Sequence, residues 1–126
     1  MFFGKRNTTG EIGERLARKF LRKLGWRIVK KNLRVGRDEI DILAVSPMGD
    51  TLALVEVRST ENPAKDPRET VRHQKRRCML RAARQLRSQA SIHECTLRID
   101  LITVNLGFSP PRVVYFEKAI PLGGYI

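Results

Sequence analysis

Cysteines, acidic residues and long apolar runs are all scarce in this sequence. The two cysteines, Cys78 and Cys95, are not spaced like metal ligands, and two are too few for a disulfide framework. No stretch approaches the roughly 18 consecutive apolar residues of a membrane-spanning helix. Residues 1–4 are too short for the apolar core of a signal peptide. We therefore expect a cytoplasmic protein with no disulfides and no membrane partner.

Internal repeats and low-complexity segments are also absent. The chain has 126 residues, of which 41% are hydrophobic, and this suffices for one folded domain with its own core. We predict a single domain over residues 1–126, with a flexible basic segment at residues 1–7.

Positive charge is abundant and unevenly placed. The chain has 25 Lys and Arg against 13 Asp and Glu, which gives a net charge of +12. Residues 1–37 hold twelve of the basic residues with two acids, and residues 65–87 hold nine with two acids. Such a surplus favours a polyanionic partner, most often nucleic acid, although an anionic membrane would also attract it.

The clearest structural signal is a β-hairpin between residues 39–45 and 52–58. Both segments are rich in Ile, Val and Leu, and Pro47 and Gly49 between them favour a tight turn. A turn centred on residues 48 and 49 would pair residues whose numbers sum to 97.

In that register Asp41 faces Glu56, and Glu39 faces Arg58. Carboxylates that face each other across a strand pair repel, and apolar neighbours make an unpaired charge costly. Three kinds of compensation stay open: a bound cation, a raised pKa on one acid, or nearby Arg and Lys. An all-oxygen pair suits Mg²⁺, whereas pairing with surface Arg on a solvated face is the alternative.

A first helix is predicted to begin at a capping box formed by Thr8 and Glu11 and to stop at Gly25. Gly13 falls near the centre of its apolar stripe, which predicts a close approach to the sheet. Glu14 falls at the border of that stripe. It could reach the end of the sheet, but a solvated charge near the helix N-terminus is the favoured interpretation.

A second helix is predicted from about Pro67 to about Ser88. Lys75 lies on its apolar stripe and either extends its charge to solvent or points at an anionic site. The apolar stripe consists of Val71, Cys78, Met79, Ala82, Ala83 and Leu86. The other basic residues fan around the polar face: Arg72, Arg76, Arg77, Arg81, Arg84 and Arg87.

Three further strands are predicted at residues 26–33, 97–106 and 112–116, with a loop over residues 59–66. Arg98 and Asp100 interrupt the second of these strands and are interpreted as a structural pair. The resulting α-β-β-β-α-β-β order predicts an α/β fold, with a mixed central sheet flanked by two helices.

An acid on the first helix, the two hairpin acids and a basic second helix occur here in a known order. The chain resembles the PD-(D/E)xK restriction-endonuclease-like superfamily, whose core is αβββαβ. Within it, the chain is similar to the YraN-like family of uncharacterised bacterial proteins, which resemble archaeal Holliday junction resolvases. The resemblance covers nearly the whole chain and rests on Gly13-Glu14-Ala17, Gly25-Trp26, Asn32-Leu33-Arg34, Glu39-Ile40-Asp41-Ile42, Val55-Glu56-Val57-Arg58, Lys75, Ala82-Ala83, Arg98-Ile99-Asp100 and Ile120-Pro121.

This resemblance implies roles for five side chains. Asp41 and Glu56 would bind Mg²⁺ or Mn²⁺, and Glu14 would be an auxiliary metal ligand. Lys75 would orient the phosphate. Arg58 stands where the superfamily has its signature Lys; because Arg stays protonated it cannot act as a general base, but it can clamp a phosphate oxygen. The implied catalytic set is Asp41, Glu56, Arg58 and Lys75.

The implied function is a metal-dependent endonuclease that hydrolyses DNA, including branched or junction DNA. The alternative is a nucleic-acid-binding module with weak or no catalysis, and a third hypothesis is a basic adaptor or ribosome-associated factor. A homodimer is a further expectation, because junction-cleaving relatives work as dimers. The side chains expected to contact nucleic acid are Arg34, Arg37, Arg72, Arg76 and Arg77.

Overall fold

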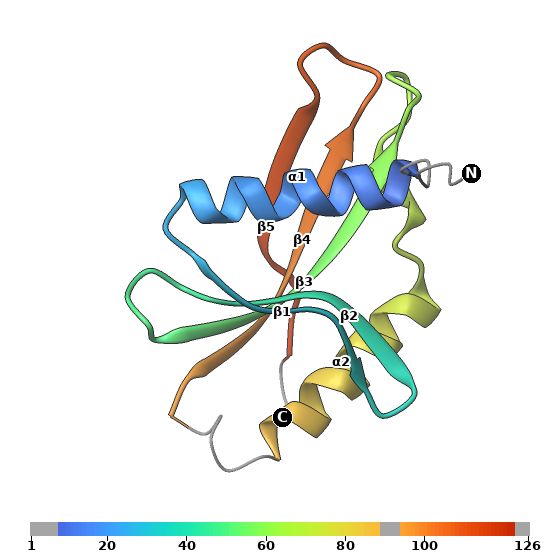
Figure 1. Cartoon of the computed structure of the whole chain (residues 1–126). Coiled ribbons are helices and arrows are strands. Elements are labelled where there is room, and N and C mark those ends of the chain that lie inside the picture. Colours follow the sequence, from blue (N-terminus) through green and yellow to red (C-terminus); the bar gives the residue numbers. More distant parts are fainter. Residues whose placement is uncertain (1–7, 89–93, 123–126) are drawn as a thin grey trace, which may run out of the picture.

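The computed structural model describes residues 8–88 and 94–122, which form a five-stranded sheet with a helix on each face (Figure 1). The segment predicted to be flexible, residues 1–7, lies outside the described residues. The elements are α1 (Thr9–Lys23), β1 (Arg27–Val35), β2 (Asp38–Val45), β3 (Thr51–Thr60), the 3₁₀ helix η1 (Pro67–Thr70), α2 (His73–Arg87), β4 (Thr96–Asn105) and β5 (Arg112–Ile120). The predicted fold class is confirmed: a mixed sheet with two helices, consistent with the αβββαβ restriction-endonuclease-like core.

The strands lie in sequence order from β1 to β5. The pair β3–β4 is parallel, and the other neighbours are antiparallel. The hairpin register predicted from the sequence is confirmed where β2 and β3 pair, from Val45 opposite Leu52 to Ile42 opposite Val55. The ladder then stops, whereas β3 and β4 stay paired along their whole length.

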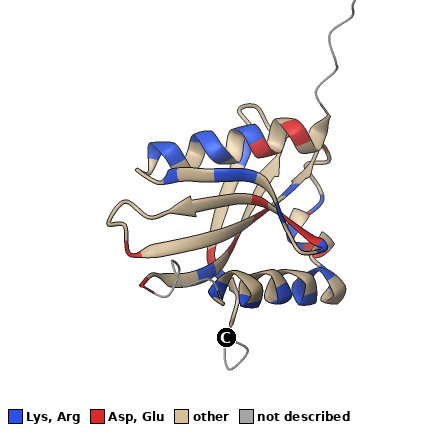
Figure 2. Ribbon diagram, turned by 60° about the horizontal axis from the view of Figure 1, so that its bottom comes forward, with Lys and Arg blue, Asp and Glu red and all other residues tan. Residues whose placement is uncertain are grey.

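The two helices lie on opposite faces of the sheet (Figure 2). A separate apolar core lies under each helix. Alternate residues of a strand point to opposite faces. Leu54 of β3 therefore joins the core under α2 with Met79, while Val55 joins the core under α1 with Leu21.

Helix α1 begins and ends as its sequence predicts. The Thr8 hydroxyl accepts from the Glu11 N–H at 3.1 Å, and the Glu11 side chain accepts from the Thr8 N–H, which completes the capping box. Gly25 follows the helix with φ +92. A Cβ on Gly13 would lie 1.8 Å from Ser59 Oγ, so the predicted close approach to the sheet is confirmed.

The second helix begins six residues later than predicted. Asp66 caps η1 and Pro67 opens it, but this helix ends at Thr70, and the extended backbone of Arg72 then precedes α2. Pro67 therefore does start a helix, as predicted, but this helix is the short η1 and not α2. Cys78, which lies on the predicted apolar stripe, is only half-buried.

Strand β5 extends to Ile120, four residues beyond its predicted end. A register shift between Ile99 and Leu101 lets the strand continue past Lys118, whose φ is +54. Among the described residues, no helix is long and apolar enough to cross a membrane.

Candidate active site

Asp41 lies where strands β2 and β3 separate. Their last paired residues are Ile42 and Val55. Beyond them, the Val57 N–H would face Ile40 in a continued ladder, but it donates instead to Asp41 Oδ2 at 2.9 Å. The half-buried Asp41 carboxylate therefore takes the place of a backbone carbonyl at the fork.

Glu56 is 4% exposed and pairs with two cationic side chains. Arg58 Nη2 lies 2.7 Å from Glu56 Oε2, and Lys75 Nζ lies 3.5 Å from Glu56 Oε1. Lys75 thus points at an anionic group, one of the two possibilities left open by its sequence position. The Lys75 contact is an ion pair without a hydrogen bond, because Oε1 is buried and has no hydrogen-bond partner among the described residues.

Arg58 and Lys75 compensate the negative charge of Glu56 only in part, and the pKa of Glu56 shows this. Burial, and then the negative charge of Asp41, raise the pKa of Glu56 to about 7, although Lys75 and Arg58 act in the opposite direction. Two of the compensations expected from the sequence, a raised pKa and nearby bases, are therefore both present. The third, a bound cation, stays a prediction.

Glu14 of α1 belongs to the same electrostatic environment. It is half-buried, and burial followed by the charge of Asp41 raises its pKa. Glu14 is therefore only partly solvated and senses the charge of Asp41, which leaves both interpretations of its position open. Among the residues that the structure describes, no three Asp, Glu, His or Cys side chains form a group that could hold a metal ion. The role of Glu14 as an auxiliary ligand stays a prediction.

The Asp41–Glu56 pair has the donor chemistry of a Mg²⁺ or Mn²⁺ site. Mg²⁺ is commonly held by one or two carboxylates, with waters and substrate phosphate completing its coordination. The buried Glu56 oxygen has no hydrogen-bond donor, and a cation would relieve both that deficit and the repulsion between the two acids. The residues present therefore fit a divalent cation.

The five arginines predicted to contact nucleic acid are all exposed. Arg37 at the β1–β2 turn and Arg77 of α2 line one open hollow of about 550 Å³. Arg76 lines another hollow together with Glu56. Figure 2 shows Lys and Arg along both helices, on opposite sides of the sheet, with several acids near the strand crossing between them. Basic residues therefore lie on both sides of the sheet whose strands carry Asp41 and Glu56.

An ion pair that the sequence did not reveal ties the start of β2 to α2. Arg81 Nε and Nη2 donate to the two Asp38 oxygens at 2.7 and 2.6 Å. Asp38 is buried, and the Arg81 guanidinium lowers its pKa. The two residues are 43 positions apart, so no local pattern could have paired them. This contact fixes the segment that leads into Asp41.

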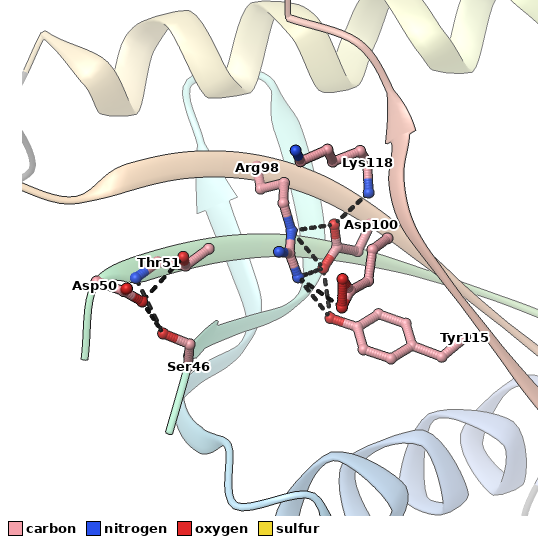
Figure 3. A network of polar contacts seen from close by, with 8 residues as sticks. Ser46, Asp50, Thr51, Arg98, Asp100, Tyr115 and Lys118 are labelled. Atoms are coloured by element: carbon pink, nitrogen blue, oxygen red, sulfur yellow. Dashed lines mark hydrogen bonds and ion pairs between the residues drawn. The ribbon is translucent and has the colours of Figure 1, made fainter. Parts of the chain in front are cut away.

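The predicted structural pair Arg98–Asp100 is confirmed (Figure 3). Arg98 donates through Nε and Nη2 to Asp100, and Tyr115 Oη and the Lys118 N–H donate to the same carboxylate. Asp100 is fully buried but fully engaged. Asp100 therefore has a structural role and is not part of the candidate active site.

Comparison with known proteins places the chain in a family. The model of the "Uncharacterised protein family UPF0102" matches residues 13–104. The chain belongs to this family. The YraN-like family expected from the sequence is thereby confirmed, while its place in the nuclease superfamily stays a prediction.

Other UPF0102 proteins align with most of the chain. A UPF0102 protein of Dehalococcoides mccartyi is 31% identical over 116 residues, which cover 91% of this chain and 94% of the relative. One of Trichlorobacter lovleyi is 34% identical over 122 residues, covering 94% and 95%. The solved structure of Pyrococcus furiosus SfsA in complex with Ca²⁺ has 16% identity and a TM-score of 0.30, covering 86% of this chain and 61% of that one. This likeness is too weak to carry an argument.

Proposed function

We propose that this UPF0102 protein is a metal-dependent endonuclease that hydrolyses phosphodiester bonds in DNA, including branched DNA. The observation that carries the proposal is the convergence of Asp41 and Glu56 at the β2–β3 fork. There a buried carboxylate oxygen lacks a hydrogen-bond partner and the pKa of Glu56 is raised to about 7. Perturbed carboxyl pairs of this kind occur preferentially at functional sites.

Asp41 and Glu56 would hold Mg²⁺ or Mn²⁺, with Glu14 as an auxiliary ligand. A bound divalent cation supplies an activated water and stabilises negative charge on the phosphate. Lys75 and Arg58, which form ion pairs with Glu56, would orient and clamp phosphate oxygens once a cation compensates the acid.

The exposed arginines would hold the phosphate backbone on either side of the acids. Backbone contacts of this kind release counterions, so affinity should fall steeply as salt rises. DNA binding without a salt slope would contradict this part of the proposal.

One observation favours a second candidate, a DNA-binding module with weak or no catalysis. Arg58 holds Glu56 at 2.7 Å, so this acid already has a partner where the superfamily has a Lys. Arg cannot give up its proton to serve as a base. The two candidates share the binding surface and differ only in what the acids do.

The test is cleavage of a labelled four-way junction, a flap and a duplex in Mg²⁺, Mn²⁺ or EDTA. Asp41→Asn keeps an oxygen for the Val57 N–H but removes the charge. We expect it to reduce metal-dependent cleavage by about 1,000-fold or more while DNA binding is kept. Glu39→Gln, an exposed acid on the same strand, is the matched control and should cleave normally.

Binding without cleavage by the wild-type protein would support the second candidate. Arg58→Lys then identifies the cause. Cleavage gained by this variant would show that Arg58 limits catalysis, and continued absence of cleavage would reject the endonuclease. An oligomeric state measured by light scattering, with and without DNA, tests the proposed homodimer.

A further inference from the structure

Two adjoining hollows lead away from Glu56 along the α2 side of the sheet. The first, of about 270 Å³, is lined in part by Glu56, and the second, of about 390 Å³, in part by Phe108 and Arg112. Arg68 and Phe116 line both hollows and therefore form the wall between them. Together the hollows make one groove that begins at the candidate active site.

Each hollow presents a flat cationic and aromatic surface. The guanidinium carbon of Arg68 lies 5.0 Å from the centroid of the Phe116 ring, and that of Arg112 lies 3.9 Å from the centroid of Phe108. Nucleobases stack on aromatic rings and on Arg guanidinium planes regardless of sequence. Hollows of this size suit single ring systems, whereas a duplex keeps its bases stacked on one another.

The wall of the groove is held in place without a ligand. The Asn105 side-chain amide donates to the carbonyls of Asn62 and Lys65 at 3.2 and 3.3 Å, which fixes the loop after β3. Asp66 accepts from Arg68 Nε at 2.9 Å and from Nη2 at 2.7 Å, which orients the guanidinium. Preorganised surfaces of this kind lose little freedom when they bind.

Charge along the groove suits a phosphate backbone at the end far from Glu56. Glu117, an acid of the first hollow, lies 3.6 Å from Arg98 and is thus partly neutralised. Lys65 and Arg112 line the second hollow, and within the described residues neither has a carboxylate partner. These two side chains are therefore available to phosphates.

We propose that this groove binds a single-stranded segment of the DNA substrate, with bases stacked in the hollows and the backbone held by Lys65 and Arg112. Phe116 and Arg112 are four residues apart on β5, or about 14 Å at a rise of roughly 3.4 Å per residue. This is the span of a few stacked nucleotides at about 3.4 Å each. The inference rests on the proposed function, because the groove starts at Glu56. It narrows the substrate to DNA with a single-stranded flank beside the cleaved bond.

The test compares single-stranded and duplex binding in EDTA, where no metal-dependent cleavage occurs. The probe is a labelled oligothymidine of about ten nucleotides, within the site size of single-strand-binding folds, with a duplex of the same length beside it. Phe116→Leu and Phe108→Leu should each weaken oligothymidine binding by about 5- to 150-fold, with duplex binding unchanged. Phe116→Tyr keeps a ring and should keep the affinity. Phe20→Leu removes a ring on the α1 side and is the matched control.

The proposal would be overturned if the two Phe→Leu variants lost affinity equally for the single strand and the duplex, or lost no affinity for the single strand. A Phe116→Tyr variant that binds as weakly as Phe116→Leu would also overturn it. Photo-cross-linking of an iodouracil-substituted oligonucleotide to the wild-type protein gives a measurement that does not depend on how variants fold. Cross-links at Phe116 or Phe108 are expected, and cross-links confined to other surfaces would reject the proposal.

The two proposals fail in different ways. If no DNA is cleaved under any condition but ring loss still weakens single-strand binding, only the endonuclease is lost. If cleavage depends on Asp41 but the ring variants bind and cut flaps normally, only the groove is lost.

Discussion

Asp100 and Glu56 are buried carboxylates on the neighbouring strands β4 and β3, yet their surroundings differ. Asp100 accepts hydrogen bonds from Arg98, Tyr115 and the Lys118 backbone, and it is fully buried. Glu56 is nearly as buried, but one of its oxygens has no hydrogen-bond partner among the described residues, and its pKa is raised to about 7. A fully hydrogen-bonded charge rigidifies a fold. A partly compensated one stays responsive to protons and cations.

The largest change in folding stability is expected from breaking the hydrogen-bond network around Asp100. Asp100→Asn leaves Arg98 without its buried counter-charge, and removing one partner of a buried pair costs about 3–5 kcal/mol. Urea unfolding followed by circular dichroism should show this loss. Glu117→Gln is the control, because Glu117 is exposed and its contact with Arg98 should contribute less than about 1 kcal/mol. A similar loss in both variants would contradict the comparison.

Glu56→Gln is expected to stabilise the fold, whereas Asp100→Asn destabilises it. Because the pKa of Glu56 is raised from 4.5 to about 7 in the folded protein, its ionisation lowers stability as the pH rises through that interval. Above pH 7 the full penalty, about 3 kcal/mol, is present. Glu56→Gln should recover up to that amount at pH 8, have little effect near pH 4.5, and flatten the stability profile between them. Thermal unfolding across this range measures it, and a destabilised variant at pH 8 would reject the comparison.

A smaller loss is expected from Tyr115→Phe. The hydroxyl lies 2.5 Å from Asp100 Oδ2, and a hydrogen bond to a charged group contributes about 1.5–3 kcal/mol. The loss should fall at the lower end, because Arg98 and Lys118 continue to donate. The ring contacts with Phe20 and Trp26 are kept, so the change isolates the hydroxyl. An unchanged urea midpoint would show that Asp100 does not need this donor.

The smallest effect is expected from added Mg²⁺ without DNA. If about 10 mM Mg²⁺ binds with a Kd of about 1 mM, it should stabilise the fold by about 1.4 kcal/mol at pH 8. Asp41→Asn should abolish this shift in melting temperature, whereas Asp100→Asn should keep it. Equal shifts in both variants would mean that the cation binds elsewhere.

The hairpin was predictable because its turn residues and its apolar alternation agree on one register. The capping box and Gly13 were predictable for the same reason, since each acts locally or on one helix face. The end of the β2–β3 ladder was not, because strand separation depends on what packs against β2 from elsewhere. The predicted register brought Asp41 close to Glu56, but the ladder ends one pair earlier, at Ile42 and Val55, and the hydrogen bond from the Val57 N–H to Asp41 could not be foreseen.

The second helix shows where local signals mislead. An acidic cap and a proline at the first position mark a helix start, and both occur at η1. They do not reveal how long the helix is, and the break before α2 has no sequence signal of its own. The pair Arg81–Asp38 and the stacking of Arg68 on Phe116 also depend on distant segments. The candidate acids were thus predictable and their supporting contacts were not.

The early end of the β2–β3 ladder has a mechanical consequence. Glu56 lies in the central part of the sheet, where β3 and β4 are paired along ten residues each and resist deformation. Asp41 lies on the part of β2 that has separated from β3. This part is held to β3 by the hydrogen bond from the Val57 N–H to the Asp41 carboxylate, and to α2 by the Asp38–Arg81 ion pair. The Arg81–Asp38 ion pair therefore joins the basic helix α2 directly to the strand that carries Asp41, whereas Glu56 is held by the pairing of β3 with β4.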